Sequence, residues 1–186
     1  MSKRHAIHDK ALGNWIKLQE IEYEDARGVR RTWESAGRRH NHGAAVMIAR
    51  LRPSGRYILV EQYRPPADSF VIEFPAGIMD PEEAPAATAV RELREETGYH
   101  GIVRTGSNPL LGSPGMSTER LHLVLMDVDE ALPENQALTT EWDESEHIVT
   151  HLVAPADALA FLRDQEAAGR MIDSRVMAYF LGLAAG

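Results

Sequence analysis

One segment, residues 77–99, constrains this chain more than any other part of it. It reads GIMDPEEAPAATAVRELREETGY and carries glutamates close together, among them Glu92, Glu95 and Glu96. On a helix, Glu92 and Glu96 lie about 40° apart, and Glu95 lies about 60° to the other side. Carboxylates crowded onto one helix face repel each other unless positive charge lies among them. The segment therefore predicts a helix whose acidic face binds something positive.

The same segment favours metal-assisted chemistry on a phosphate compound. Hard divalent cations such as Mg²⁺ take oxygen ligands and recruit substrate phosphates. The alternative is a solvated glutamate-rich helix whose charges pair with nearby arginines, and Arg91 and Arg94 are the basic residues available within the segment. The flanks favour the first interpretation, because Gly98 stands where a helix C-terminal glycine belongs and Val90 and Leu93 lie on an opposite, apolar stripe.

The segment matches the signature of the Nudix hydrolases at every fixed position, from Gly77 through Glu83 to residues 91–98. On this resemblance the chain is identified as a member of that family. The resemblance implies the Nudix fold, in which a mixed β-sheet is sandwiched between helices. It also implies hydrolysis that depends on Mg²⁺, with Mn²⁺ as a possible substitute.

Hydrophobic patterning predicts strands before and after the glutamate-rich helix, which gives a mixed α/β (α+β) class. Two N-terminal strands, residues 15–23 and 29–38, are expected to form an antiparallel region around a turn that ends at Gly28. The predicted helices span residues 82–97, 156–168 and 174–184. The other predicted strands span residues 44–51, 57–63, 70–74, 101–105, 121–127 and 147–153.

We expect two parts in the chain: an N-terminal, dimer-forming strand region over residues 1–42 and the Nudix hydrolase domain over residues 43–186. The 186 residues carry 20 Lys and Arg against 28 Asp and Glu, and a net charge of −8 argues against a nucleic-acid partner. The chain has no cysteine, which excludes disulfides and fits a reducing cytoplasm. The longest wholly apolar run, residues 44–49, is too short to cross a bilayer. We therefore expect a cytoplasmic protein with a small-molecule substrate and no membrane partner.

Three features outside the signature resemble the ADP-ribose pyrophosphatase branch of the family. The first is the pair of segments EQYRPP, residues 61–66, and IEFPAG, residues 72–77. The second is Pro114, which stands sixteen residues after Gly98. The third is the N-terminal stretch with Trp15 and Trp33, which resembles enzymes whose paired tryptophans sandwich a base across a dimer. The resemblance implies hydrolysis of ADP-ribose to AMP and ribose 5-phosphate by a homodimer.

The resemblance also implies metal ligands. Glu92 and Glu96 are the main candidates, with Glu95 next and Glu83 weaker. In the family, the carbonyl of the residue before the signature glycine also contacts a metal, and that residue here is Ala76. A pyrophosphate is doubly anionic and repels an anionic nucleophile, so charge neutralisation must supply much of the rate.

The general base is expected outside the signature, in residues 141–148. Glu146 is the first choice and Glu144 the second, so the predicted catalytic set is Glu146 and Glu144 together with Glu96 and Glu92. Arginine suits phosphate because its planar guanidinium binds bidentately, whereas Arg91 is expected to anchor the loop and helix by ion pairing. The predicted substrate-binding residues are Trp15, Trp33, Arg38, Arg64, Glu73, Gly115 and Met116.

Several alternatives stay open on the sequence alone. Trp15 and Trp33, which we expect near the open end of the N-terminal hairpin, can pack in a core instead of stacking on a base. The substrate can be another nucleoside diphosphate sugar, such as GDP-mannose or ADP-glucose. The chain can also be a sensor that binds an ADP-ribose-like ligand without turnover, although a sensor is expected to lose a metal-binding glutamate or to carry a DNA-binding module.

Overall fold

The structure is a computed structural model that describes residues 1–40, 42–142 and 147–186. It divides into two compact units: unit 1 comprises Met1–Gly43 and Asn108–Leu121, and unit 2 comprises Ala44–Ser107 and His122–Gly186. The domain boundary predicted at residue 42 stays a prediction, because compact units within one subunit do not test which segments fold independently.

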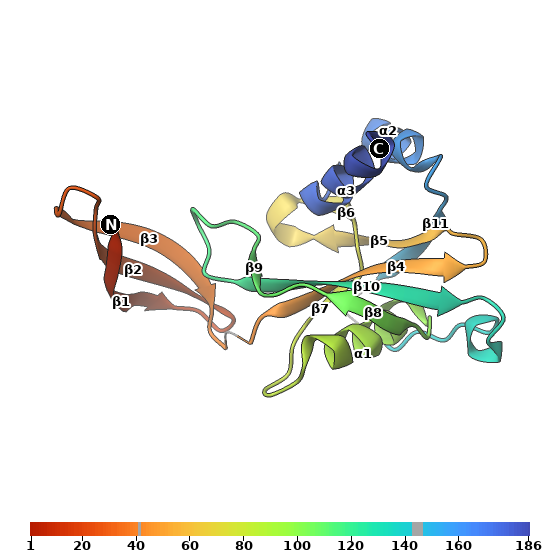
Figure 1. The fold of residues 1–186 in the computed structure, drawn as a ribbon, viewed down its shortest axis with the longest axis horizontal. Helices are drawn as coiled ribbons and strands as arrows, with labels where there is room; N and C mark the ends of the chain where they lie inside the picture. The colour runs from red at the N-terminus through yellow and green to blue at the C-terminus, as the bar shows by residue number, and fades with distance from the viewer. Residues whose placement is uncertain (41, 143–146) are drawn as a thin grey trace. The chain divides into compact units, whose positions relative to one another are not determined.

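Unit 1 contains a three-stranded antiparallel sheet in the order β1 (Lys3–Leu12), β2 (Ile16–Glu24) and β3 (Arg30–Arg38) (Figure 1). The predicted hairpin is the β2–β3 pair. Its turn is held by the Asp25 carboxylate, which accepts hydrogen bonds from the backbone N–H groups of Arg27 (2.9 Å) and Val29 (3.0 Å). An aspartate that bonds the backbone two residues on is a common way to start a turn.

The first strand, β1, was not expected from the sequence. Its side chains are almost all exposed, so it lacks the alternation of buried and exposed residues that marks a strand. It pairs with β2 through the backbone and through polar side-chain contacts such as His8–Glu22 (2.9 Å) and Lys10–Glu20 (3.1 Å). Pairing of this kind leaves little trace in hydrophobic patterning.

The register of the hairpin separates the two tryptophans. Ile21 pairs with Trp33, whereas the carbonyl of Trp15 accepts the backbone N–H of Arg39 at 2.9 Å. Trp15 therefore lies at the open end and Trp33 lies midway along β3. The expectation that both lie near the open end is wrong for Trp33, because the turn at residues 25–28 fixes the register of the two strands.

The second segment of unit 1 carries the short strand β9 (Leu110–Leu111), which pairs with the start of β10 (Arg120–Asp129). The loop between them contacts β3: Ala36 donates its backbone N–H to Met116, and Thr118 donates to the carbonyl of Ala36. A Cβ on Gly37 would lie 2.7 Å from the Thr118 hydroxyl, so the glycine permits this close approach.

The large mixed sheet has the order β12–β6–β5–β4–β10–β8, with β11 paired to β5, β7 to β4 and β9 to β10. Its strands in unit 2 are β4 (Ala44–Arg52), β5 (Tyr57–Arg64), β6 (Ser69–Glu73), β7 (Ala76–Ile78), β8 (Ile102–Gly106), most of β10, β11 (Ile148–Val153) and β12 (Met171–Ile172). Short 3-10 turns span Pro65–Ala67 and Pro133–Asn135. The predicted strands are present. Strands β7, β9 and β12 were missed because two or three residues carry no readable period.

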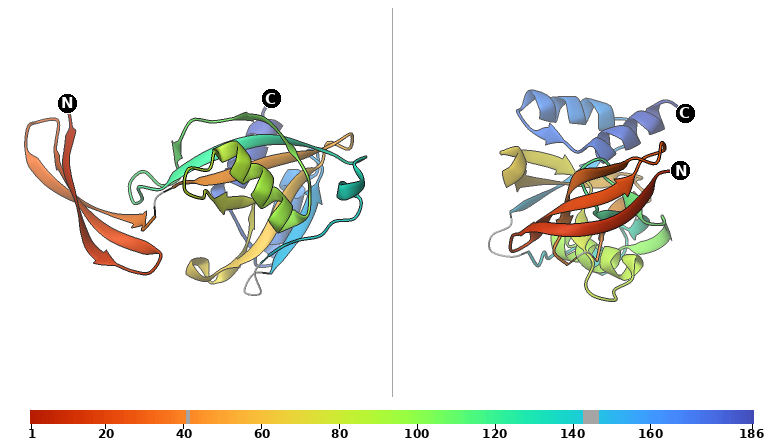
Figure 2. Two further views of the ribbon diagram at one scale, coloured as in Figure 1. Left: turned by 90° about the horizontal axis from the view of Figure 1, so that it is seen from below. Right: turned by 90° about the vertical axis from the view of Figure 1, so that its left-hand side faces the viewer.

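Helix α1 (Pro85–Thr97) covers one face of this sheet, and α2 (Ala158–Ala167) and α3 (Ser174–Ala184) cover the other (Figures 1 and 2). Met47 and Leu51 of β4 pack with Leu93 of α1 in one core cluster. Ile48 of β4 packs with Phe180 of α3 in the other. The predicted sheet between helices is confirmed, and successive β4 side chains alternate between its two faces.

The acidic helix begins later than predicted, at Pro85 instead of residue 82. Glu82 has a left-handed backbone (φ 64°), and Ala84 is extended (φ −76°, ψ 145°), as expected for a residue before proline. Pro85 then suits the first helical position, where its missing N–H costs nothing. At the other end, Gly98 adopts φ 75° and donates its N–H to Arg94 (2.8 Å), as its position in the sequence predicts. Among the helices of the described residues, none is long and apolar enough to span a membrane.

Candidate functional site

The glycine at the start of the signature lies directly against the acidic helix. An ideal Cβ on Gly77 would lie 1.9 Å from the Glu92 carboxyl carbon, which no side chain can tolerate. Gly77 is part of β7, which pairs with β4 through Ala45. The glycine thus lets the strand backbone and the Glu92 carboxylate approach each other.

Arg91 lies within a cluster of carboxylates. Its guanidinium contacts Glu92 at 2.8 Å, Glu95 at 3.0 Å and Glu83 at 3.0 Å, and it also donates to the carbonyl of Ile78 at 3.3 Å. The hydrogen bond with Glu83 has the largest effect on the pKa of Arg91. Together the carboxylates raise that pKa above its ordinary value, although burial lowers it. The prediction that Arg91 anchors the loop and helix by ion pairing is confirmed.

Glu83 precedes α1 in the sequence, but several hydrogen bonds hold its carboxylate in place. Besides Arg91, its carboxylate accepts the hydroxyl of Thr88 (2.8 Å) and the backbone N–H of Asp80 (3.2 Å). Hydrogen bonds from Arg91 first, and then from Thr88 and Asp80, lower the pKa of Glu83 to about 2 although burial opposes them. Glu83 therefore ties the loop before α1 to the helix.

Two further predicted ligands lie on the same helix. Glu96 accepts the backbone N–H of Ala76 at 3.1 Å, so the residue before the signature glycine and this glutamate are neighbours. Glu95 contacts Arg91, and its other oxygen lies 4.0 Å from Arg94. The structure thus brings together Ala76 of β7, Glu83 of the following loop and the three glutamates of α1.

A second pair of predicted residues meets on β5 and β6. Glu73 is buried and accepts the Arg64 guanidinium in a bidentate arrangement, with the closest contact at 2.6 Å from Nη2 to Oε2. Bidentate arginine–carboxylate pairs are strong and fix the orientation of both groups. Glu73 therefore sets where the Arg64 fork lies.

One polar cluster in unit 2 was missed by sequence reasoning. Glu61 of β5 is buried and contacts His151 Nε2 (3.0 Å) and Arg170 Nε (3.1 Å). Burial raises the pKa of Glu61, but the hydrogen bonds from His151 and Arg170 outweigh it and leave that pKa below its ordinary value. Its partners lie far away in the sequence, so no spacing could have pointed to them. The cluster joins β5, β11 and the start of β12.

In unit 1, three of the predicted substrate-binding residues lie together. The Trp33 indole donates its Nε1–H to the carbonyl of Gly115 at 2.9 Å, and the next residue, Met116, accepts a backbone hydrogen bond from Ala36 at 2.8 Å. Trp33 is 51% exposed and Trp15 is 80% exposed, so neither packs in a core of this subunit. Arg38 of β3 forms an ion pair with Glu119, a partner that the sequence did not indicate.

Comparison with known proteins decides the family. Residues 41–174 match the NUDIX domain. This chain belongs to the Nudix family. An uncharacterized Nudix hydrolase of Schizosaccharomyces pombe is 36% identical over 178 residues, which cover 92% of this chain and 87% of that protein. The ADP-ribose pyrophosphatase of Saccharomyces cerevisiae is 37% identical over 142 residues, which cover 72% of this chain and 62% of that protein.

A solved structure, described as the crystal structure of an ADP compounds hydrolase, shares the Nudix fold with this chain. Its TM-score is 0.72 at 20% sequence identity, and the match covers 99% of this chain and 92% of that one. At this identity the likeness bears on the fold alone.

The charge balance on this Nudix helix fits a divalent cation. Four carboxylates, on Glu83, Glu92, Glu95 and Glu96, lie near the half-buried guanidinium of Arg91 and the more distant one of Arg94, which leaves negative charge in excess. Oxygen donors of this kind are those that Mg²⁺ takes. In the described residues no three acidic or histidine side chains already converge on a shared metal position. Arg91 holds Glu92 and Glu95, and a cation would have to compete with it.

The predicted general bases cannot be placed. Glu146 and Glu144 lie outside the described residues, and both assignments stay predictions. Glu141, near the end of the described segment before them, forms an ion pair with Arg94 of α1 at 3.2 Å and donates its backbone N–H to the carbonyl of Glu95 at 2.9 Å. The segment that leads to the predicted bases is thus attached to the acidic helix.

Proposed function

We propose that this Nudix protein hydrolyses the pyrophosphate bond of ADP-ribose to AMP and ribose 5-phosphate. The observation that carries the proposal is the packing of the signature loop on α1, with Gly77 against Glu92 and Ala76 against Glu96. This packing holds the carboxylate oxygens of α1 beside the backbone of β7, where they can bind a cation that also contacts the substrate phosphates. The name of the yeast relative, an ADP-ribose pyrophosphatase, supports the choice of substrate.

Glu92 and Glu96 would hold the metal, with Glu95 and the carbonyl of Ala76 as further ligands. Mg²⁺ is the proposed metal and Mn²⁺ the substitute; when bound, it neutralises the pyrophosphate charge and makes the attacking water more acidic. Arg91 keeps the glutamates in place before binding, because each of its ion pairs fixes one carboxylate on the helix.

The substrate would be oriented by residues outside the signature. Arg64, already set in direction by Glu73, offers a guanidinium for phosphate, and Arg38 is the second such candidate. Trp33 and Trp15 offer flat faces for the adenine, and the hydrogen bond from Trp33 to Gly115 fixes the plane of the indole. Glu146 is the proposed base that takes the proton from water, with Glu144 second.

A second copy of this chain would complete the arrangement. Unit 1 exposes Trp15, Ile16, Leu18 and Trp33, and exposed apolar side chains on one small sheet favour burial against a partner. A twofold dimer would generate two equivalent sites. Sedimentation equilibrium at micromolar concentration tests this directly, and a monomer of 20.7 kDa would reject the dimer. A cytoplasmic location stays a prediction.

One assay tests the proposed reaction. Release of nucleoside monophosphate is followed with Mg²⁺ for ADP-ribose, ADP-glucose, GDP-mannose and a UDP-sugar. We expect ADP-ribose to give the highest kcat/KM. A higher value for GDP-mannose would change the substrate and keep the hydrolase. Tight binding of ADP-ribose without release of AMP would favour the sensor instead.

A further inference from the structure

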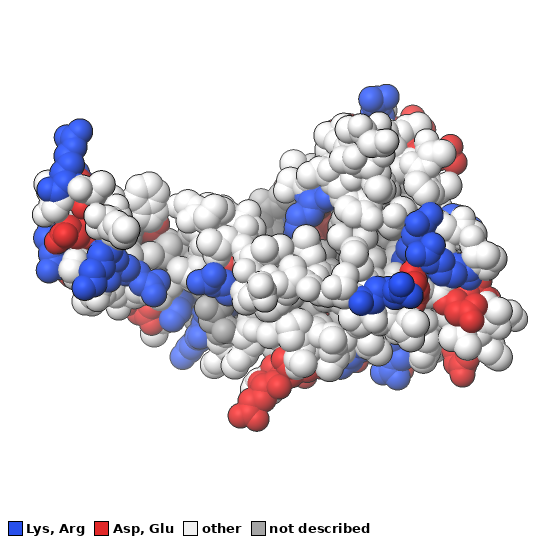
Figure 3. Space-filling model, in the orientation of Figure 1, with Lys and Arg blue, Asp and Glu red and all other residues white. Residues whose placement is uncertain are grey.

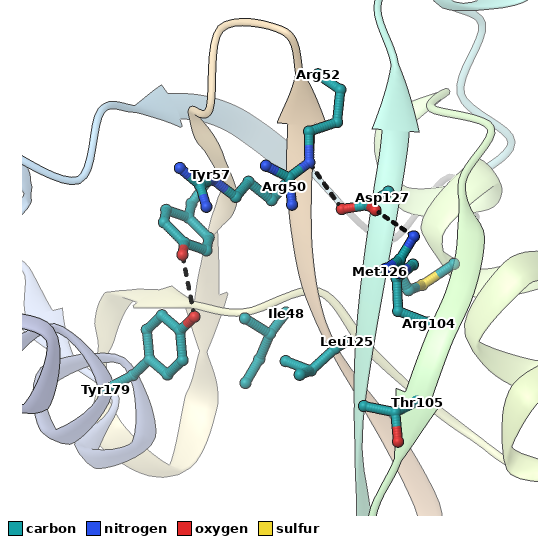
Figure 4. Close-up of a pocket in the computed structure, with 10 residues that line it drawn as sticks. All are labelled: Ile48, Arg50, Arg52, Tyr57, Arg104, Thr105, Leu125, Met126, Asp127 and Tyr179. Atoms are coloured by element: carbon teal, nitrogen blue, oxygen red, sulfur yellow. Dashed lines mark hydrogen bonds and ion pairs between the residues drawn. The ribbon is translucent and has the colours of Figure 1, made fainter.

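A cavity of about 400 Å³ opens on the face of the sheet away from α1 (Figure 4). Successive side chains of β4 point to opposite faces of the sheet. Met47 and Leu51 pack with α1, so Arg50 and Arg52 project from the other face. Val124 and Val128 of β10 likewise belong to the core on the α1 side. The cavity is therefore separate from the acidic helix, and its volume falls in the range of small-molecule sites.

Positive charge dominates the lining. Arg50 and Arg52 come from β4 and Arg104 from β8, while Asp127 of β10 is the one carboxylate among the described lining residues. Asp127 bridges two of the guanidiniums, at 2.9 Å to Arg52 and 3.4 Å to Arg104. Two positive charges remain in excess. On unit 2, Figure 3 shows Lys and Arg side chains in blue with Asp and Glu side chains in red among them.

The arginines are held in position before any ligand arrives. Asp127 orients two of them, and Arg50 donates to the carbonyl of Gly55 at 3.0 Å and lies 5.6 Å from the centre of the Tyr57 ring. A guanidinium that is already oriented loses less conformational entropy on binding an anion. Each guanidinium thus has a partner within the chain, while the Arg52 and Arg104 side chains are 50% and 65% exposed and accessible to a ligand.

The remaining lining has an uncharged part. Ile48 and Leu125 lie between the arginine–aspartate end and a pair of tyrosines, Tyr57 and Tyr179, whose hydroxyls are 3.1 Å apart (Figure 4). One hydroxyl donates to the other, so the acceptor keeps its own proton for a further partner. Burial and the bond to Tyr57 raise the pKa of Tyr179, which keeps that proton in place at neutral pH.

We propose that this cavity is a second ligand site, which binds a small organic monophosphate. Arg52 and Arg104, which Asp127 bridges, take the phosphate, and Arg50 beside Tyr57 adds positive charge to the cavity (Figure 4). The uncharged body of the ligand lies over Ile48 and Leu125 and meets the tyrosine hydroxyls. The site uses none of the residues assigned to hydrolysis.

The test uses isothermal titration calorimetry on the full chain with EDTA present, so that no metal supports binding at α1. The probes are ribose 5-phosphate, inorganic phosphate and unphosphorylated ribose. We expect ribose 5-phosphate to bind more tightly than inorganic phosphate, and ribose to give no signal. Arg104→Gln should raise the dissociation constant about tenfold or more, because it removes a charge-assisted hydrogen bond. Arg52→Gln is the second variant, and Arg163→Gln, an exposed arginine on α2, is the matched control.

Glu96→Gln separates this site from the acidic helix. We expect it to leave ribose 5-phosphate binding unchanged, and we expect Arg104→Gln to leave kcat for ADP-ribose unchanged. Binding that is lost in Glu96→Gln and kept in both arginine variants would overturn the proposal. So would equal affinity for inorganic phosphate and ribose 5-phosphate, or no binding of ribose 5-phosphate at millimolar concentration. The binding results do not depend on whether ADP-ribose is the substrate.

Discussion

In unit 2, β4 places Met47 and Leu51 in a core, while in unit 1 β2 leaves Ile16 and Leu18 60% and 44% exposed. Both apolar core clusters consist of unit 2 residues. The sheet of unit 1 is held by backbone pairing and by exposed charged contacts, which each contribute little. Unit 2 thus has its own source of stability, whereas the apolar side chains of unit 1 gain most from a partner surface.

The difference extends to the predicted site residues. In unit 2 they are fixed by buried or half-buried ion pairs within the chain, such as Arg91 with Glu83 and Arg64 with Glu73. In unit 1 the tryptophans keep large exposed faces, and one indole hydrogen bond to Gly115 orients Trp33. We infer that unit 2 supplies the chemistry and the phosphate contact of Arg64, and that unit 1 supplies the contact with the base. Four sets of variants test this division.

The largest effect is expected from Glu96→Gln and Glu92→Gln in unit 2. Glutamine keeps the size of the side chain and removes the charge that would hold the cation. We expect kcat for ADP-ribose to fall by about 10²–10³-fold or more, since loss of one stabilising group in a preorganised site costs that much. The measurement is AMP release with Mg²⁺. Glu166→Gln, at an exposed position on α2, is the matched control. Near-normal turnover in both Glu96→Gln and Glu92→Gln would contradict the metal assignment.

The second change addresses the general base. Glu146→Gln should lower kcat about 10²-fold, the lower end of what a positioned base contributes. Mg²⁺ affinity should stay unchanged, because the metal ligands are elsewhere. Glu144→Gln is the paired variant: if it does the damage and Glu146→Gln does not, the base is Glu144. Loss of Mg²⁺ affinity in Glu146→Gln would make that residue a ligand instead of a base.

The third change measures how firmly unit 2 holds its loop. The pKa of Glu83 is lowered to about 2, so its stabilising effect is fully present above its ordinary value of 4.5 and is lost as the pH falls through about 2. Glu83→Gln should lower the free energy of unfolding by about 1–3 kcal/mol at neutral pH, because Arg91 loses a charged partner. Urea unfolding at several pH values measures this.

The pH dependence is the discriminating part of that experiment. The gap between wild type and Glu83→Gln should narrow as the pH falls from about 4.5 towards 2, because the wild-type carboxylate becomes protonated. Glu82→Gln, at the exposed neighbouring position, should show neither the loss nor the narrowing. A gap that stays constant with pH would mean that packing, and not charge, holds the loop.

The acidic helix was predictable because its information is local. The spacing of Glu92, Glu95 and Glu96 sets one face, and Gly98 sets the end. Its start was misplaced by three residues because the left-handed conformation of Glu82 has no sequence marker of its own. The alternating strands of unit 2 were readable for the same reason, since each buries a face.

Contacts between distant segments were not predictable in this way. Nothing in the spacing indicates that Glu119 pairs with Arg38, or that His151 and Arg170 meet Glu61. Strand β1 was not predicted, because polar side chains on both of its faces leave no alternation of apolar and polar residues in the sequence. The register that separates Trp15 from Trp33 depends on the turn around Asp25, which hydrophobic patterning does not encode.

The smallest effect is expected from Trp33 in unit 1, and it tests the recognition half of the comparison. Trp33→Ala should raise KM for ADP-ribose about 2- to 12-fold, the equivalent of roughly 0.5–1.5 kcal/mol for an aromatic stacking pair. Because stacking is present in the ground state and in the transition state alike, kcat should stay nearly constant. Steady-state kinetics separate the two constants. Trp33→Phe keeps a flat but smaller ring and loses the hydrogen bond to Gly115, so its KM should rise less than that of Trp33→Ala. If KM is unchanged in Trp33→Ala, Trp33 does not hold the base, and its exposed face is left for the proposed contact with a second copy of the chain.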